Sequence, residues 1–150
     1  MWILKKIKCA NPPELNSHCK KNPIFAPCFL TIETIMKIQQ IISLIEGTIV
    51  EGETLSNKEV DCAFASDLMS DVLTLKTDKT VMLITGLCNM QTIRTCEMSD
   101  IKVIMFVRGK KVTEEMRELA EDNEMVLITT DFSLYRTSGL LFGAQLSGVY

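Results

Sequence analysis

Charged and polar side chains stand directly after apolar runs of this sequence, where folding would gather them at one edge of a sheet. Asp67 follows the run 60–65, and Arg108 and Lys110 follow the run 103–107. Arginine and lysine bind anions such as phosphate, as do the N–H groups that begin a helix. The candidate binding residues are Ser66, Asp67, Thr85, Gly86, Asn89, Arg108, Gly109 and Lys110. We expect a site for a nucleotide or another small anion here, the alternative being that these residues form only turns and helix caps.

Residues for catalysis are sparse. His18 is the only histidine, so nucleophilic catalysis by Ser or Cys lacks its usual base. The phosphate loops GxxxxGK[S/T] and GxGxxG are absent. Cys9, Cys19 and Cys28 do not combine with His18 at the spacing of a zinc site. We therefore expect no enzyme activity, no metal site and no cofactor.

Two enzymatic alternatives remain open. Cys88 precedes a predicted helix, whose positive N-terminal end could stabilise a thiolate for redox chemistry. Asp67 and Asp71 could share one helix face and hold Mg²⁺, so that Asp67 and Arg108 would serve phosphoryl transfer. A half-buried thiol and a solvated helix face are the more common interpretations of such residues.

Three apolar runs, 81–85, 103–107 and 125–129, begin at equal spacing along the chain. Each is too apolar for a strand with one wet face, and amphipathic stretches of helical period separate them. This pattern predicts an α/β fold of three layers, with a mainly parallel sheet covered by helices on both faces. Ligands of such folds bind beyond the carboxyl ends of the strands, where the candidate residues lie.

Periodicity and capping residues predict the other elements. Gly47 would end the first helix, Ser66 or Asp67 would cap the second, and Thr113 and Asp131 would cap later ones. Gly139 and Gly143 would weaken the last helix, so a break or close packing is expected there. The expected helices cover 36–46, 66–73, 89–99, 113–122 and a stretch after Asp131, and the expected strands cover 48–50 and 60–65.

Residues 1–35 differ from the rest of the chain. They carry a net charge of +3, whereas residues 36–150 carry −6, and they hold all four prolines and the single tryptophan. We expect an irregular or disordered extension, or the product of a start codon placed too far upstream, ahead of an α/β domain over 36–150. A partner-binding arm is the alternative.

The composition excludes several classes of protein. A formal net charge of −3 is unlike that of nucleic-acid binders, which usually carry a basic face. No apolar stretch is long enough to cross a membrane. The six cysteines form no CxxC pair, which indicates free thiols in the cytoplasm. We expect no nucleic-acid or membrane partner.

Four segments carry a resemblance to a known family: 65–75, 83–86, 106–110 and 126–130. Through them, residues 36–150 resemble a stand-alone DRTGG domain, the module found in long bacterial phosphate acetyltransferases and in pyrophosphatases with CBS domains. A related fold forms the N-terminal part of HPr kinase. The resemblance implies that fold, a regulatory role without catalysis and a homodimer. Stand-alone copies look like proteins of anaerobic bacteria.

The signature that names the family is mostly missing. Its Asp-Arg pair falls on Cys88 and Asn89, and its Thr-Gly-Gly falls on 107–109, where only Gly109 agrees. Arg108 would then replace the missing positive charge. The expected function is a ligand-sensing or interaction module that acts as a homodimer in the cytoplasm. The alternatives are a pure dimerisation scaffold, with an apolar patch on the last helix, and a small enzyme.

Overall fold

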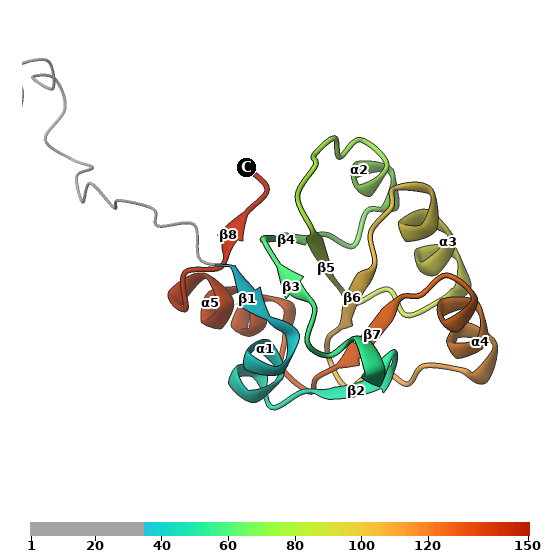
Figure 1. Cartoon of the computed structure of the whole chain (residues 1–150), viewed down its shortest axis with the longest axis horizontal. Coiled ribbons are helices and arrows are strands. Elements are labelled where there is room, and N and C mark those ends of the chain that lie inside the picture. Colours follow the sequence, from blue (N-terminus) through green and yellow to red (C-terminus); the bar gives the residue numbers. More distant parts are fainter. Residues whose placement is uncertain (1–34) are drawn as a thin grey trace, which may run out of the picture. The chain divides into compact units, whose positions relative to one another are not determined.

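The computed structural model of the protein describes residues 35–150. A sheet of six strands forms its centre, in the order β2-β7-β6-β5-β4-β8 (Figure 1). All neighbouring strands are parallel except β2, which pairs antiparallel with β7. The strands are β2 (Thr48–Glu51), β4 (Cys62–Ala65), β5 (Val81–Thr85), β6 (Val103–Phe106), β7 (Val126–Thr129) and β8 (Ser147–Gly148).

Helices cover both faces of this sheet, which confirms the expected three-layer α/β fold. One face carries α1 (Ile38–Ile45) and α5 (Leu134–Gly143). The other carries α2 (Met69–Val72), α3 (Met90–Met98) and α4 (Glu114–Asp122), as Figure 1 shows.

Alternate residues of each central strand serve the two faces. In β5, Met82 and Ile84 pack with α1 and α5, whereas Leu83 packs with α3 and α4. Because the side chains on both faces of the strand are buried, the sequence shows continuous apolar runs instead of alternating apolar and polar residues. Polar side chains are therefore left to the strand ends.

Short strands at the start of the domain were not expected. β1 (Met36–Lys37) pairs antiparallel with β3 (Glu59–Val60), so the first helix begins at Ile38 and not at Met36. The expected strand over 60–65 is divided between β3 and β4. A short 3₁₀ turn, Glu53–Leu55, links β2 to this ribbon.

Several expected caps are wrong in detail. Glu46, and not Gly47, takes the left-handed conformation that ends α1, with φ of 50°. Thr113 precedes α4, but its side chain makes no capping hydrogen bond. Ser133 caps α5 by accepting a hydrogen bond from the N–H of Arg136, so Asp131 does not.

The last helix runs unbroken through Gly139 and ends at Gly143. The expected break is therefore confirmed only at its end. A Cβ added at Gly139 would meet no atom within 4 Å, so close packing does not explain this glycine either.

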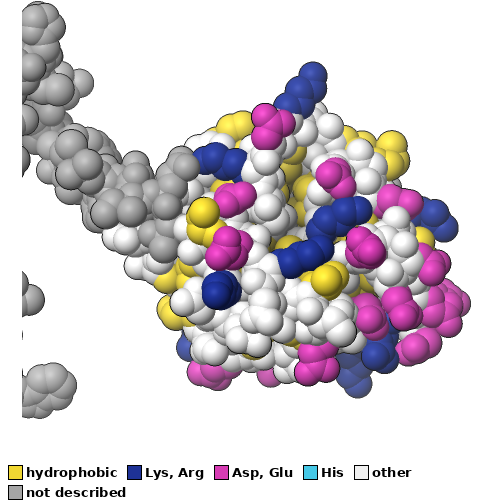
Figure 2. Space-filling view, in the orientation of Figure 1, with side chains coloured by type: hydrophobic (Ala, Val, Ile, Leu, Met, Phe, Trp, Pro, Cys, Tyr) yellow, Lys and Arg dark blue, Asp and Glu magenta, His cyan; other side chains and the backbone are white. Residues whose placement is uncertain are grey.

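Acidic side chains gather over α4, which carries Glu114, Glu115, Glu118, Glu121 and Asp122 (Figure 2). No helix among residues 35–150 is long and apolar enough to cross a membrane. The interpretation of residues 1–35 as an irregular extension concerns residues that, except for Ile35, lie outside the described part of the chain.

Candidate functional site

Four parallel strands, β4 to β7, end at one edge of the sheet and deliver the expected polar residues there. We call this edge the rim. Beyond β6 the chain turns to α4 on one face, whereas beyond β7 it turns to α5 on the other face. Adjacent strands whose connections diverge in this way leave a crevice between them, and that is where ligands of open α/β sheets bind.

A single carboxylate, that of Asp67, joins three strand ends at the rim. Its Oδ1 accepts a hydrogen bond from the N–H of Gly86 at 2.6 Å and from the hydroxyl of Thr85 at 3.0 Å. Its Oδ2 accepts from Nη2 of Arg108 at 3.0 Å. Residues that follow β4, end β5 and follow β6 thus meet at one acidic group.

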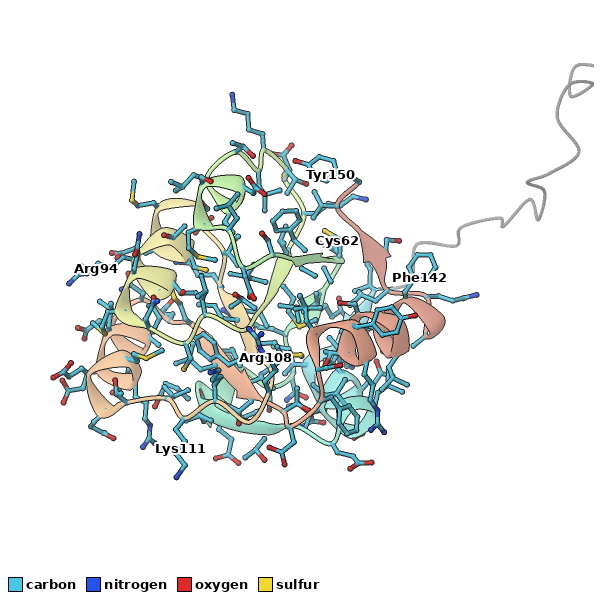
Figure 3. The ribbon with its side chains drawn as sticks, turned by 180° about the vertical axis from the view of Figure 1, so that it is seen from behind. Cys62, Arg94, Arg108, Lys111, Phe142 and Tyr150 are labelled. Atoms are coloured by element: carbon cyan, nitrogen blue, oxygen red, sulfur yellow. The ribbon has the colours of Figure 1, made fainter. Side chains whose placement is uncertain are left out.

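Arg108 lies over the backbone of Gly86. A Cβ at position 86 would coincide with the guanidinium, so only glycine leaves room for this packing. Arg108 has φ of 68°, a conformation that costs energy for a residue other than glycine, and its N–H donates to the carbonyl of Phe132 at 2.9 Å. Figure 3 shows Arg108 well inside the outline of the domain, with Lys111 at the periphery. The backbone of Arg108 is thus tied to the loop after β7 while its side chain reaches the end of β5.

The pKa of Asp67 reflects these contacts. Burial raises the pKa, but the hydrogen bonds from Gly86 and Thr85 and the charge of Arg108 more than offset that effect. The pKa of this carboxyl therefore lies below its ordinary value of 3.8, and the group is ionised at neutral pH.

Two other expected site residues serve local structure. Asn89, expected to bind a ligand, caps α3, because its Oδ1 accepts from the N–H of Thr92 at 2.9 Å. Ser66 accepts from the N–H of Leu68 at 3.0 Å and donates to the same residue's carbonyl. The helix α2 begins after Leu68, so the expectation that Ser66 or Asp67 caps it is wrong.

A polar depression of about 190 Å³ lies where β7 ends, between β2 and the loop after β6, and its lining includes neither Asp67 nor Arg108. Two of the candidate binding residues, Gly109 and Lys110, line it, and Gly109 has a left-handed φ of 59°. Its other lining residues were not predicted from the sequence: Glu46, Thr48, Thr129, Thr130 and Asp131. Glu46 and Thr48 lie near the start of the described residues, far in sequence from β7. They reach the depression because β2 pairs antiparallel with β7, and the sequence showed no sign of that pairing.

The structure does not favour a reactive thiolate at Cys88. Burial raises the pKa of this thiol, an effect that Lys110 only partly opposes, and its Sγ donates to the carbonyl of Lys111. Burial also raises the pKa of Cys96 to about 12. Across residues 35–150, no three His, Cys, Asp or Glu side chains are grouped so that they could hold a metal ion.

Comparisons with known proteins support the fold. Neither models of protein families nor curated protein sequences give a match. Among solved structures, the CBS and DRTGG domains of the regulatory region of Clostridium perfringens pyrophosphatase are similar, with a TM-score of 0.57 and 16% identity. The match covers 75% of this chain and 48% of that one, so this chain spans about half of that regulatory region. At this identity the likeness supports a DRTGG-like fold and nothing finer.

The depressed pKa of Asp67 predicts a specific sensitivity to acid. As the pH falls, the unfolded chain binds the proton at a higher pH than the folded protein, so acid favours unfolding. The stability from Asp67 is present above pH 3.8 and is lost as the pH falls through the lower, folded value. Urea titrations should show that Asp67→Asn loses less stability than the wild type between about pH 5 and pH 3. Equal losses in both proteins would contradict this assignment.

The packing of Arg108 on Gly86 predicts a mild effect for Gly86→Ala. The added methyl group meets only the end of a flexible side chain, so the variant should fold and lose no more than about 1 kcal/mol. Side-chain NMR should show that Arg108 has left Asp67. The control, Gly139→Ala, has open space and should gain about 0.5–1 kcal/mol from helix propensity. A loss of several kcal/mol in Gly86→Ala would show that Arg108 is fixed in place.

Proposed function

We propose that this protein is a regulatory module without catalysis that binds a nucleotide or another small anion at the rim. The observation that carries the proposal is the placement of Arg108. Its backbone is held in a left-handed conformation in the loop after β6, and its half-exposed guanidinium lies on Gly86, the residue that follows β5. Lys110 adds a second positive charge from the same loop.

The charge of the domain supports a small ligand over a polymeric one. Residues 36–150 carry a net charge of −6, with a dense acidic surface over α4 (Figure 2). This field repels a nucleic acid, whose binding needs a wide basic face. A nucleotide is small enough to contact the rim alone, where Arg108 and Lys110 supply positive charge.

The structural neighbour supports the same class of function. That regulatory region was solved in complex with its activator, diadenosine tetraphosphate. A regulatory role also agrees with the chemistry of the described residues, which include no histidine and whose Cys88 thiol stays protonated. We extend the role to this chain as a proposal, with Arg108 in place of the family's missing arginine.

A homodimer forms the second part of the proposal, and helix α5 is the surface that favours it. Tyr135 and Phe142 on α5 are 91% and 75% exposed, and Tyr150 at the end of the chain is 91% exposed. These three rings border an apolar hollow of about 670 Å³ between α5 and the β4–β8 edge, and Figure 3 shows Phe142 and Tyr150 on the same side of the domain. Aromatic rings bury about 150–250 Å² each, so two copies of this face would cover roughly 1,000 Å², near the lower limit of a specific interface.

Ligand binding is tested by thermal unfolding with ATP and with inorganic pyrophosphate. A ligand that binds only the folded state at about 100 times its Kd adds about 2.7 kcal/mol, which raises the Tm by several degrees. Arg108→Ala should abolish the shift. Lys111→Ala removes an equal charge from an exposed side chain at the periphery and should keep it. The absence of any shift in the wild type would leave only the scaffold function.

The dimer is tested by sedimentation equilibrium of the wild type and two variants. Phe142→Glu places a charge in the proposed interface and should yield a monomer. Met98→Glu is the matched control, because Met98 is 78% exposed on α3 and lies outside the proposed face. A wild type that stays monomeric at high concentration would rule the dimer out.

A further inference from the structure

The rim already holds an anion, and it is part of the chain. The Asp67 carboxylate accepts from a backbone N–H, a hydroxyl and a guanidinium, the kinds of donor that a bound phosphate would use. Thr85 and Gly86 were expected to face a ligand, but both donate to Asp67. A ligand that approaches Arg108 therefore meets a competitor that is permanently present.

The contact between Asp67 and Arg108 is weak enough to be exchanged. A single ion-pair contact, from Nη2 to Oδ2, joins the two side chains, which are 41% and 50% exposed. An ion pair with this exposure contributes little to stability, since water screens it on both sides. No other contact of the guanidinium with an acidic group occurs among residues 35–150. Arg108 can thus leave Asp67 without unfolding the rim, where Thr85 and Gly86 still hold the carboxylate.

We propose, on the basis of the proposed function, that Asp67 is a specificity-determining residue that holds Arg108 in reserve and admits only anions that outcompete a tethered carboxylate. A tethered group has a high effective concentration, so a singly charged ligand gains nothing by replacing it. A diphosphate carries more charge and more oxygens, and it can engage Arg108 and Lys110 together. Asp67 therefore sets a threshold of affinity, which di- and polyphosphates, the chemistry of nucleotide tails, exceed most readily.

Replacing Asp67 by asparagine removes the competing negative charge and keeps a side chain of nearly the same shape. Its carbonyl oxygen can still accept from Gly86 and Thr85, whereas its amide group offers no anionic partner to Arg108. The change therefore releases Arg108 and leaves the anchoring of the loop intact. Asp71→Asn is the matched control, because Asp71 is an exposed acid only four residues away on α2 and forms no ion pair with Arg108.

The experiment measures the Kd of inorganic pyrophosphate and of inorganic phosphate by calorimetry at neutral pH and constant salt. Asp67→Asn should bind pyrophosphate about fivefold more tightly than the wild type, the upper range for release of an exposed ion pair. Inorganic phosphate should gain no more than this factor, because either anion must displace the same carboxylate to reach Arg108. Asp71→Asn should match the wild type. A gain in affinity cannot arise from damage to the fold.

The outcomes separate this inference from the proposed function. If Arg108→Ala abolishes binding but Asp67→Asn leaves affinity unchanged or lower, Asp67 is no competitor and the anion site stands. An equal gain in Asp71→Asn would show a general effect of charge and would overturn the inference as well. If neither the wild type nor Asp67→Asn binds either anion, both proposals fail. If only Asp67→Asn binds, the wild type admits no anion, so the proposed function fails and the inference that rests on it fails as well.

Discussion

The carboxylate of Asp67 joins the ends of three neighbouring strands, and the geometry of the rim depends on it. It anchors the turn at Thr85 and Gly86 and draws Arg108 across the end of β5. This meeting is possible because the strands are parallel and buried on both faces, which excludes polar side chains from the sheet and collects them where the strands end. The glycine at position 86 completes the arrangement, since any larger residue would displace the guanidinium.

The sequence predicts this frame well where one physical signal dominates. The central strands and the helices between them follow from continuous burial and from helical period, and β5 has the predicted bounds. Caps are harder to predict, because several neighbouring residues can supply the same bond. Ser133 and not Asp131 caps the start of α5, and Glu46 and not Gly47 takes the left-handed cap position after α1. The pairing of Asp67 with Arg108 depends on strand order in space, which no local pattern encodes. The short strands β1, β3 and β8 carry too few residues to show any period.

A fold of this class determines where on the sheet a ligand can bind, but it does not determine which ligand binds there. The similar pyrophosphatase region shares the layered architecture at 16% identity, so the side chains at the rim must be judged in this chain alone. Cys88 is a thiol packed against the next loop and Asn89 is a helix cap, so neither supplies a positive charge at the rim. Positive charge comes instead from the loop after β6. The likeness to that region therefore extends to the fold and not to the charged side chains at the rim.

Thr130 shows that the first helix depends on residues far along the chain. Its buried hydroxyl donates to the carbonyl of Ile45, the last residue of α1, at 2.8 Å across 85 positions of sequence. The strand β2 likewise finds its only neighbour in the sheet in β7. Neither the bond from Thr130 to α1 nor the pairing of β2 can form until β7 has been synthesised. The strands β4 to β7, in contrast, can pair one after another as each is made, because each follows its neighbour in the sequence. Contacts between distant segments slow folding, so newly made α1 and β2 should remain exposed to proteases and chaperones until the end of synthesis.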